Sequence, residues 1–401
     1  MHSALAAMAT TLTARRVVAA PAAADSLIVL WMNGGPSHVD TWDPKPGSKG
    51  AGPMKAIKTR RAGLELSEHM PALAEVADRL CVVRSLSSKE GNHQRAQYLG
   101  RTGYSPSPTL VHPALGSWVA KKLGAPASGL PAFVSLGGPA AGAGFLGAEY
   151  GPFVSANVGA RPETAEAAVP TDRLDRRLAL LDGLEATFAA RVGSRLIEDR
   201  RHLYGAARRL MMSPSLDAFD VTKESAAVRS RYGDTDFGRG CLVARRLVQS
   251  GVRFVEVMLD GWDTHEDNFT RGKRQLAVLD PAMSSLVADL ASAPQTGATN
   301  RTLILWMGEF GRTPRLNARE GRDHHPKAWS AVLAGPGVAP GIVGATDADG
   351  ANVVGKVHAV SDLLATLATL LGLSPSEELV SPIGRPIAMT DGGAPIAAAL
   401  P

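Results

Sequence analysis

The segment Arg301–His325, RTLILWMGEFGRTPRLNAREGRDHH, has the pattern of a buried strand followed by a polar loop. The apolar run Leu303–Met307 ends at a glycine, which is typical of a buried strand in a parallel sheet. Glu309 follows directly, and ligand sites of open α/β sheets lie just beyond the carboxyl ends of the strands. The run Asp323–His325 comes a dozen residues later. This pattern indicates part of a metal site; a surface salt bridge beside two solvated histidines is the alternative for this stretch alone.

Apolar runs and helical periodicity alternate over most of the remaining chain. Further strands are predicted at Ser26–Met32, Leu80–Val83, Ala132–Leu136, Val252–Leu259 and Ser330–Leu333. Helices are predicted at Met70–Leu80, Asn92–Gly103, His112–Lys122, Phe237–Ser250, Gln275–Ala291 and Ser361–Leu371. Strands that alternate with helices predict an α/β fold with a largely parallel central sheet.

The composition is that of a folded globular chain. Of 401 residues, 45% are hydrophobic and 20% charged, so a large core can form. The net charge of +5 supports only weak attraction for anionic substrates, and nucleic-acid binding is not indicated. The two cysteines, Cys81 and Cys241, are too few for a disulfide framework and do not indicate a compartment. No stretch reaches the ~18 apolar residues of a membrane span, so no integral membrane segment is expected.

The first 25 residues differ in composition from the rest. Residues 1–24 are rich in alanine and free of acidic side chains, and the pair Arg15-Arg16 precedes VVAAPAAA. This resembles the remnant of an export signal, which would place the protein in the periplasm or outside the cell. The alternative is a disordered tail on a cytoplasmic protein. Residues 26–401 are expected to form one domain, with a helical insertion around 160–235.

Four loops share one property: each follows a predicted strand and carries histidine with a carboxylate or amide. They are Asn33–Asp43, Asn92–His93, Asp260–Asn268 and Glu309–His325. Loops after parallel strands emerge at the same edge of a sheet. Histidine with carboxylates suits Zn²⁺, Mn²⁺ or Fe, whereas carboxylates with carbonyls suit Ca²⁺ or Mg²⁺. The repetition at strand ends predicts a site for a divalent metal.

Seven segments together resemble one known family. They are LWMNGGPSHVDTWDPKPG, RSLSSKEGNH, LGAEYGPF, GWDTHEDNF, GEFGRTP, GRDHHP and LLATLATLLGL. From Ser26 to the C-terminus the chain is similar to the domain-of-unknown-function family 1501, a sulfatase-like family of the alkaline phosphatase superfamily whose members are often exported. The resemblance implies a doubly wound α/β fold with helices on both faces of the sheet. It also implies two metal ions and hydrolysis of an anionic phosphate or sulfate ester, on a small molecule or a glycan.

The resemblance assigns metal-site roles to residues of this chain. Asn33 stands where the superfamily has a metal-binding aspartate, whose role would pass to His38 or Asp40. Glu309 stands where the superfamily has an aspartate followed by histidine. The full set of expected metal ligands is His38, Asp40, Asp260, Asp263, His265, Glu309, Asp323, His324 and His325.

The resemblance also puts the usual covalent mechanism in doubt. Asn92-His93 occupies the position of the superfamily nucleophile and has no hydroxyl or thiol. We therefore expect attack by metal-activated water, with His93 as ligand or base, and with Arg312 or Arg84 binding the ester. The expected catalytic set is His93, Arg312 and Asn33, and the alternative nucleophiles are Ser37, Ser85, Ser87 and Ser88. A binding protein that keeps the fold and has lost catalysis is the second hypothesis.

Overall fold

A computed structural model describes residues 21–165, 169–192, 195–292 and 301–401. Most of the segment 1–25 therefore lies outside the described residues. Its last residues contact the domain, since the backbone N–H groups of Ala23 and Ala24 donate to the carbonyl of Leu370. The carboxylate of Asp25 also accepts hydrogen bonds from the guanidinium of Arg301.

The fold is mixed α/β and is built on one large, mostly parallel sheet of order β12-β4-β11-β8-β1-β7-β5-β6. Its strands are β1 (Ser26–Met32), β4 (Leu80–Leu86), β5 (Phe133–Leu136), β6 (Phe153–Ser155), β7 (Phe254–Leu259), β8 (Thr302–Gly308), β11 (Trp329–Ala334) and β12 (Gly341–Val343). These include the predicted strands, with β4 three residues longer than expected. Strand β11 alone in this sheet runs antiparallel to its neighbours β4 and β8. A loop without a helix joins β8 to β11, and such a connection allows an antiparallel return.

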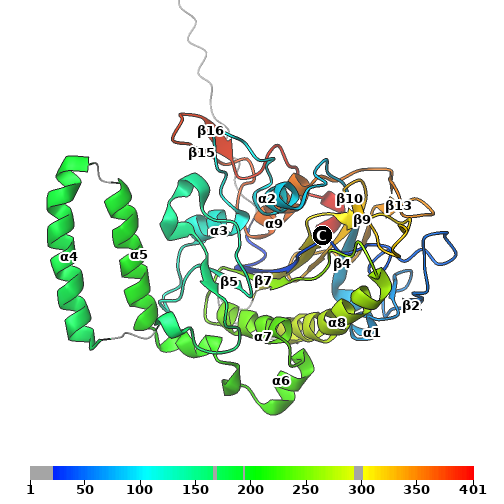
Figure 1. Cartoon of the computed structure of the whole chain (residues 1–401), viewed down its shortest axis with the longest axis horizontal. Coiled ribbons are helices and arrows are strands. Elements are labelled where there is room, and N and C mark those ends of the chain that lie inside the picture. The colour runs from blue at the N-terminus through cyan, green and yellow to red at the C-terminus, as the bar shows by residue number, and fades with distance from the viewer. Residues whose placement is uncertain (1–20, 166–168, 193–194, 293–300) are drawn as a thin grey trace, which may run out of the picture.

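Helices cover both faces of the sheet (Figure 1). Alternate side chains of the central strand β1 pack against the helices of the two faces. Ile28 and Leu30 share one core with α7 (Asp236–Gln249) and α8 (Asn268–Ser292). Leu27 and Val29 share the other core with α3 (Leu115–Leu123) and α9 (Val360–Leu370). This alternation follows from the two-residue period of a strand. Because β1 is buried on both faces, it is apolar throughout.

Two helices differ from their expected bounds. Helix α8 begins at Asn268, seven residues earlier than predicted, because the polar first turns hide its apolar periodicity. The helix predicted at Met70–Leu80 is instead α1 (Pro71–Glu75) followed by a 3₁₀ turn, η1 (Ala77–Arg79). By contrast, α2 (His93–Thr102) begins and ends as expected, with Asn92 as its N-cap and Gly103 in the left-handed conformation at its end.

Most of the described residues between Glu163 and Tyr232 are helical. The helices are η4 (Glu163–Ala165), α4 (Thr171–Val192), α5 (Arg195–Met211), η5 (Pro214–Phe219), η6 (Val221–Lys223) and α6 (Ala226–Tyr232). Figure 1 shows α4 and α5 side by side at one end of the molecule, with α4 outermost. Within the described residues, no helix combines the length and apolarity needed to cross a membrane.

The remaining elements are short. They are β2 (Ala56–Lys58) with β3 (Glu65–Ser67), β9 (Gly311–Arg312) with β10 (His324–His325), β13 (Ala345–Thr346) with β14 (Val353–Val354), β15 (Glu378–Val380) with β16 (Pro386–Ala388), and the turns η2 (Gly144–Leu146), η3 (Ala148–Tyr150) and η7 (Ala397–Ala399). The β9–β10 ladder orders the loop between β8 and β11, which carries part of the candidate site.

Candidate metal centre

The loops that follow β1, β7 and β8 meet at the carboxyl edge of the sheet. These strands are parallel neighbours, so their ends lie together. Strand β11 runs the opposite way, and its beginning therefore lies at the same edge and brings β10 there. The N-terminus of α2 contributes a fourth segment through His93. Segments far apart in the sequence thus deliver histidines and carboxylates to one place.

Three imidazoles and one carboxylate converge at this edge. The Nε2 atoms of His265 and His324 lie 2.9 Å apart. Asp263 Oδ1 lies 3.2 Å from Nε2 of His265 and 3.5 Å from Nε2 of His324. Asp263 Oδ2 lies 3.5 Å from Nε2 of His93. One ligand atom from each of His93, Asp263 and His324 falls within a mutual spacing of 4.8 Å, which suits a shared ion.

Each imidazole is oriented through its other ring nitrogen. Nδ1 of His265 bonds to Asp323 Oδ1 at 2.9 Å, and Nδ1 of His324 bonds to the Gly91 carbonyl at 2.7 Å. The hydrogen bond from His265 also holds the pKa of Asp323 below its usual range. Because both partners are acceptors, each Nδ1 donates a proton to its partner, and Nε2 is left as the ring nitrogen that can face a metal ion. Histidines that ligate metals are held in this way.

His93 is oriented by a fully buried carboxylate. Its Nδ1 lies 2.8 Å from Glu309 Oε1, which also accepts the backbone N–H of Gly34 at 2.9 Å. Both Nε2 of His93 and Oε2 of Glu309 are buried without a hydrogen-bond partner among the described residues. Gly34 has a φ of 108°, and a Cβ there would lie 2.4 Å from the backbone nitrogen of Asp263. Only glycine allows the first loop to approach so closely.

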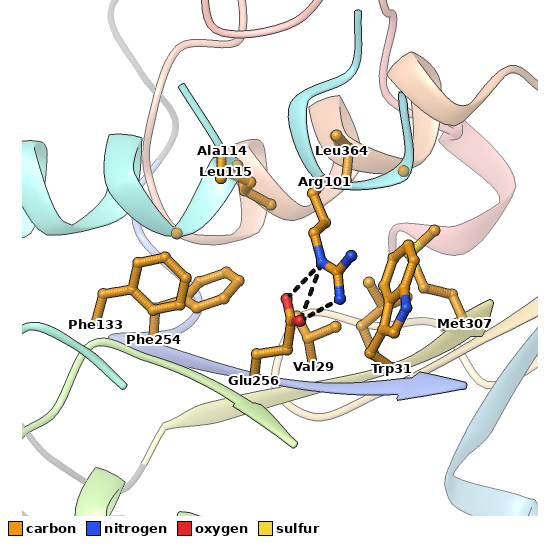
Figure 2. A pocket seen from close by; sticks show the side chains of 13 residues that line it. Val29, Trp31, Arg101, Ala114, Leu115, Phe133, Phe254, Glu256, Met307 and Leu364 are labelled. Carbon is orange, nitrogen blue, oxygen red and sulfur yellow. Dashed lines mark hydrogen bonds and ion pairs between the residues drawn. The ribbon is translucent and has the colours of Figure 1, made fainter. Parts of the chain in front are cut away.

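Helix α2 is held on the sheet by a buried ion pair in its last turn, at the opposite end of the helix from His93. Arg101 donates to the carboxylate of Glu256 on β7, with the shortest contact at 2.7 Å. Figure 2 shows this pair inside a small, mostly apolar pocket between α2 and the sheet, and the guanidinium lies over the Trp31 ring at 4.0 Å. Because α2 is short, fixing its last turn also fixes the position of His93.

The electrostatics of the cluster depend on its buried neighbours. The hydrogen bond to Glu309 raises the pKa of His93 despite partial burial. Burial lowers the pKa of His324. Partial burial alone would raise the pKa of Asp263, but the hydrogen bond and charge of Arg312 outweigh it, and the pKa falls. The centre therefore presents an ionised carboxylate beside imidazole nitrogens, a donor set that fits a divalent metal ion.

A family model described as a protein of unknown function, DUF1501, matches residues 24–400. The chain belongs to the DUF1501 family. This confirms the resemblance found in the sequence motifs. The comparison with curated proteins finds no match.

Several solved structures are distantly similar to this DUF1501 protein. A 2-O GAG sulfatase is 12% identical, with a TM-score of 0.43 over 93% of this chain and 73% of that chain. The lipoteichoic acid synthase from Listeria monocytogenes is 11% identical, with a TM-score of 0.38 over 92% of this chain and 75% of that chain. The PsFucS1 sulfatase from Pseudoalteromonas sp. is 12% identical, with a TM-score of 0.36 over 87% of this chain and 68% of that chain.

In this DUF1501 protein Arg312 contacts the protein interior. Its side chain is fully buried, with Nε donating to the Gly35 carbonyl at 2.9 Å and Nη1 to the Arg322 carbonyl at 3.0 Å. Nη2 donates to the Gly34 carbonyl and, at 2.6 Å, to Asp263 Oδ1. These donors hold the first loop and the Asp263 carboxylate, and the expected role of Arg312 in binding the ester stays a prediction.

The first-loop residues His38 and Asp40 also point away from the cluster. Asp40 forms a buried bidentate ion pair with Arg322, at 2.7 and 2.8 Å. Nε2 of His38 lies 2.7 Å from the carbonyl of Gly350. His38 and Asp40 thus join the first loop to two other loops, and the structure does not bring them to the candidate metal centre.

His325 and Asp260 are likewise outside the cluster. Nε2 of His325 lies 2.7 Å from the Ala351 carbonyl, although the neighbouring His324 is in the centre. Asp260 accepts a hydrogen bond from Asn33 Nδ2 at 2.9 Å, and Asn33 Oδ1 accepts one from Gln97 at 2.8 Å. Asn33 and Asp260 therefore connect the ends of β1 and β7.

Sequence reasoning missed several supporting groups. The Gly91 carbonyl could not be found from the sequence, because any residue has a backbone carbonyl. The Arg101–Glu256 ion pair could not be found either, because its two residues are 155 positions apart and form no local sequence pattern. Arg322 also went unnoticed, although it stands directly before the Asp323–His325 run that carries two residues of the site.

Proposed function

We propose that this chain is a metal-dependent hydrolase of anionic esters, of the phosphate or sulfate class, with the doubly wound fold of the alkaline phosphatase superfamily. One observation carries the proposal: Nε2 atoms of three histidines converge on the Asp263 carboxylate, while each Nδ1 is bound by an acceptor. Three imidazoles and a carboxylate favour Zn²⁺ or Mn²⁺ over Ca²⁺, which prefers an all-oxygen shell.

The proposed ligands are His93, Asp263, His265 and His324. Within the described residues, one group of three or more histidine, cysteine or acidic side chains has ligand atoms close enough together to share a metal ion. The proposal therefore names one ion where two were expected. A divalent ion held there would offset the charge of the ester oxygens and lower the pKa of a bound water. Glu309 and Asp323 keep the imidazoles in the tautomer that this role requires.

Water is the proposed nucleophile, and two of the four candidate serines, Ser37 and Ser85, are buried away from solvent. Ser85 is fully buried and hydrogen-bonded to Nδ1 of His358 at 2.8 Å. Ser37 is 5% exposed. His93 stands in the position of the superfamily nucleophile, and its Nε2 is free of hydrogen bonds within the described chain. His93 therefore serves as a ligand or as the base that takes the proton from water.

The test is elemental analysis of the purified protein together with a turnover screen. Aryl phosphate and aryl sulfate esters are offered with Zn²⁺, Mn²⁺, Ca²⁺ or a chelator. The expected result is bound metal and turnover that the chelator abolishes and the metal restores. Metal-free protein that stays inactive with every added ion would contradict the proposal. The periplasmic or secreted location belongs to the same proposal, and N-terminal sequencing of the protein isolated from its host tests it.

A second candidate function is metal-dependent binding without catalysis. It is favoured by the absence of a hydroxyl or thiol at Asn92-His93. Stoichiometric metal with no turnover on either ester class would select this alternative. Turnover that disappears in His93→Ala, with the metal content retained, would instead identify His93 as the base in a hydrolase.

A further inference from the structure

Helix α4 exposes a line of large apolar side chains. Leu180, Leu184 and Phe188, called here the outer stripe, are 68%, 64% and 54% exposed. Their spacing of four residues places them one above another along the helix. Figure 1 shows that α4 is the outermost helix at one end of the molecule, so no element of the described chain lies beyond it.

Three of the four acidic side chains of α4, those of Asp175, Asp182 and Glu185, pair with arginines of α5, and Asp172 pairs with Arg176 within α4. Asp175 pairs with Arg208 at 2.6 Å, and Asp182 lies 3.4 Å from Arg201. At about 100° per residue, Asp175 and Asp182 lie on the opposite side of the helix from Leu184. The line of α4 that carries the outer stripe therefore has no acidic side chain.

Positive charge continues the outer stripe toward the start of α4. Arg173 and Arg177 precede Leu184 by eleven and seven residues, spacings that fall on the same line of the helix. Both are exposed, and neither forms an ion pair with the described residues. One face of α4 thus presents three apolar side chains followed by two arginines, which is complementary to an anionic lipid surface.

The small size of the outer stripe argues against a second copy of the chain as its occupant. Three side chains can bury only a few hundred Å², whereas a stable interface buries roughly 800 Å² on each partner. Binding to a lipid surface needs less buried apolar area, because a few inserted apolar side chains act together with basic residues at the headgroups.

We propose that α4 lies on an anionic lipid surface, with the outer stripe at the acyl boundary and Arg173 and Arg177 at the headgroup phosphates. Docking by this helix would leave the metal centre accessible, because α4 lies at the opposite end of the molecule from β9 and β10 (Figure 1). The proposal is independent of the ester chemistry.

The test is sedimentation of the full chain with vesicles of phosphatidylcholine alone or mixed with phosphatidylglycerol. Binding is expected to the mixed vesicles only, and added salt should weaken it. Leu184→Glu and the double variant Arg173→Glu/Arg177→Glu should each lower the partition coefficient by about tenfold or more. The matched control is Val380→Glu, which changes a 73% exposed valine on β15 and should leave binding unchanged.

Three results would overturn the proposal. The first is equal binding to neutral vesicles, and the second is full binding by Leu184→Glu. The third is a dimer, seen by light scattering, that Leu184→Glu dissociates in a protein that does not bind vesicles; this would identify a second copy as the occupant. Circular dichroism of each variant controls for folding, which the exposed positions should preserve.

Discussion

His265 and His324 point their Nε2 atoms at one another across 2.9 Å. The opposite nitrogen of each ring donates to Asp323 or to the Gly91 carbonyl, so two neutral rings would bring two lone pairs face to face. Such an arrangement needs positive charge between the rings, supplied by a proton or by a metal ion. The nearby Asp263 carboxylate stabilises either one, and a metal ion satisfies all of these donor atoms together.

The adjacent histidines of β10 provide a matched pair for testing the metal centre. We expect His324→Ala to lose most of the bound metal, because Nε2 of His324 faces His265 and Asp263. His325→Ala should keep its metal, because its Nε2 is bound to the Ala351 carbonyl instead. Inductively coupled plasma mass spectrometry on both purified variants gives the comparison. Equal metal content in the two variants would refute the assignment.

The carboxylate behind His265 should tune the metal affinity without ligating the ion. Asp323→Ala removes the acceptor of Nδ1, and loss of such an orienting partner typically costs ~10–100-fold in metal affinity. Competition with a coloured chelator measures this change. Glu266→Ala is the control, since this exposed carboxylate lies next to His265 but pairs with Arg319. Unchanged affinity in Asp323→Ala would show that Asp323 does not orient the ring.

The edge where the centre lies could be predicted from sequence, because apolar runs mark the strands and polar loops follow them. Which of His324 and His325 faces the centre could not be predicted from the sequence. Adjacent residues of an extended segment point to opposite sides. Which side faces the centre depends on the pairing of β10 with β9, where His324 lies opposite Arg312.

The structural roles of the buried charged residues could not be predicted from the sequence either. In sequence, Asp40 and Arg312 look like site residues, since both stand in polar loops after predicted strands. In the structure Asp40 pairs with Arg322, which is 282 positions away. Arg312 in turn uses its donors on backbone carbonyls and Asp263. The sequence pattern predicts which loops lie together at the edge of the sheet. Which of their polar side chains are buried in structural hydrogen bonds depends on packing between residues that are far apart in the sequence.

The buried pair Arg101–Glu256 should contribute strongly to stability. Arg101→Met leaves the Glu256 carboxylate uncompensated among apolar side chains, which we expect to lower the free energy of unfolding by ~3–5 kcal/mol. Urea denaturation followed by tryptophan fluorescence measures the loss. Arg95→Met is the control on the same helix, because the exposed Arg95 pairs with Glu90 and its loss should lower the free energy of unfolding by much less. A similar, small loss in both variants would contradict a structural role for the buried pair.

His38 should make the stability of the protein depend on pH. Burial lowers the pKa of His38 from 6.5 to about 4, although the bond to the Gly350 carbonyl and the charge of Asp43 oppose this shift, while His325 and Arg322 add to it. Between these pH values the unfolded chain binds the proton more readily, so stability is full above pH ~6.5 and falls as the pH drops toward ~4. The shift corresponds to a loss on the order of 3 kcal/mol.

The variant His38→Gln isolates this contribution, because a glutamine amide can still donate to the Gly350 carbonyl and does not titrate. Unfolding free energies from urea denaturation at several pH values between ~4 and 7 give the comparison for wild type and variant. As the pH falls, we expect the free energy of unfolding of the wild type to decrease more than that of the variant. Only the wild type has a buried imidazole that binds a proton less readily in the folded chain than in the unfolded chain. Parallel pH profiles would show that His38 does not titrate differently in the folded and unfolded chains.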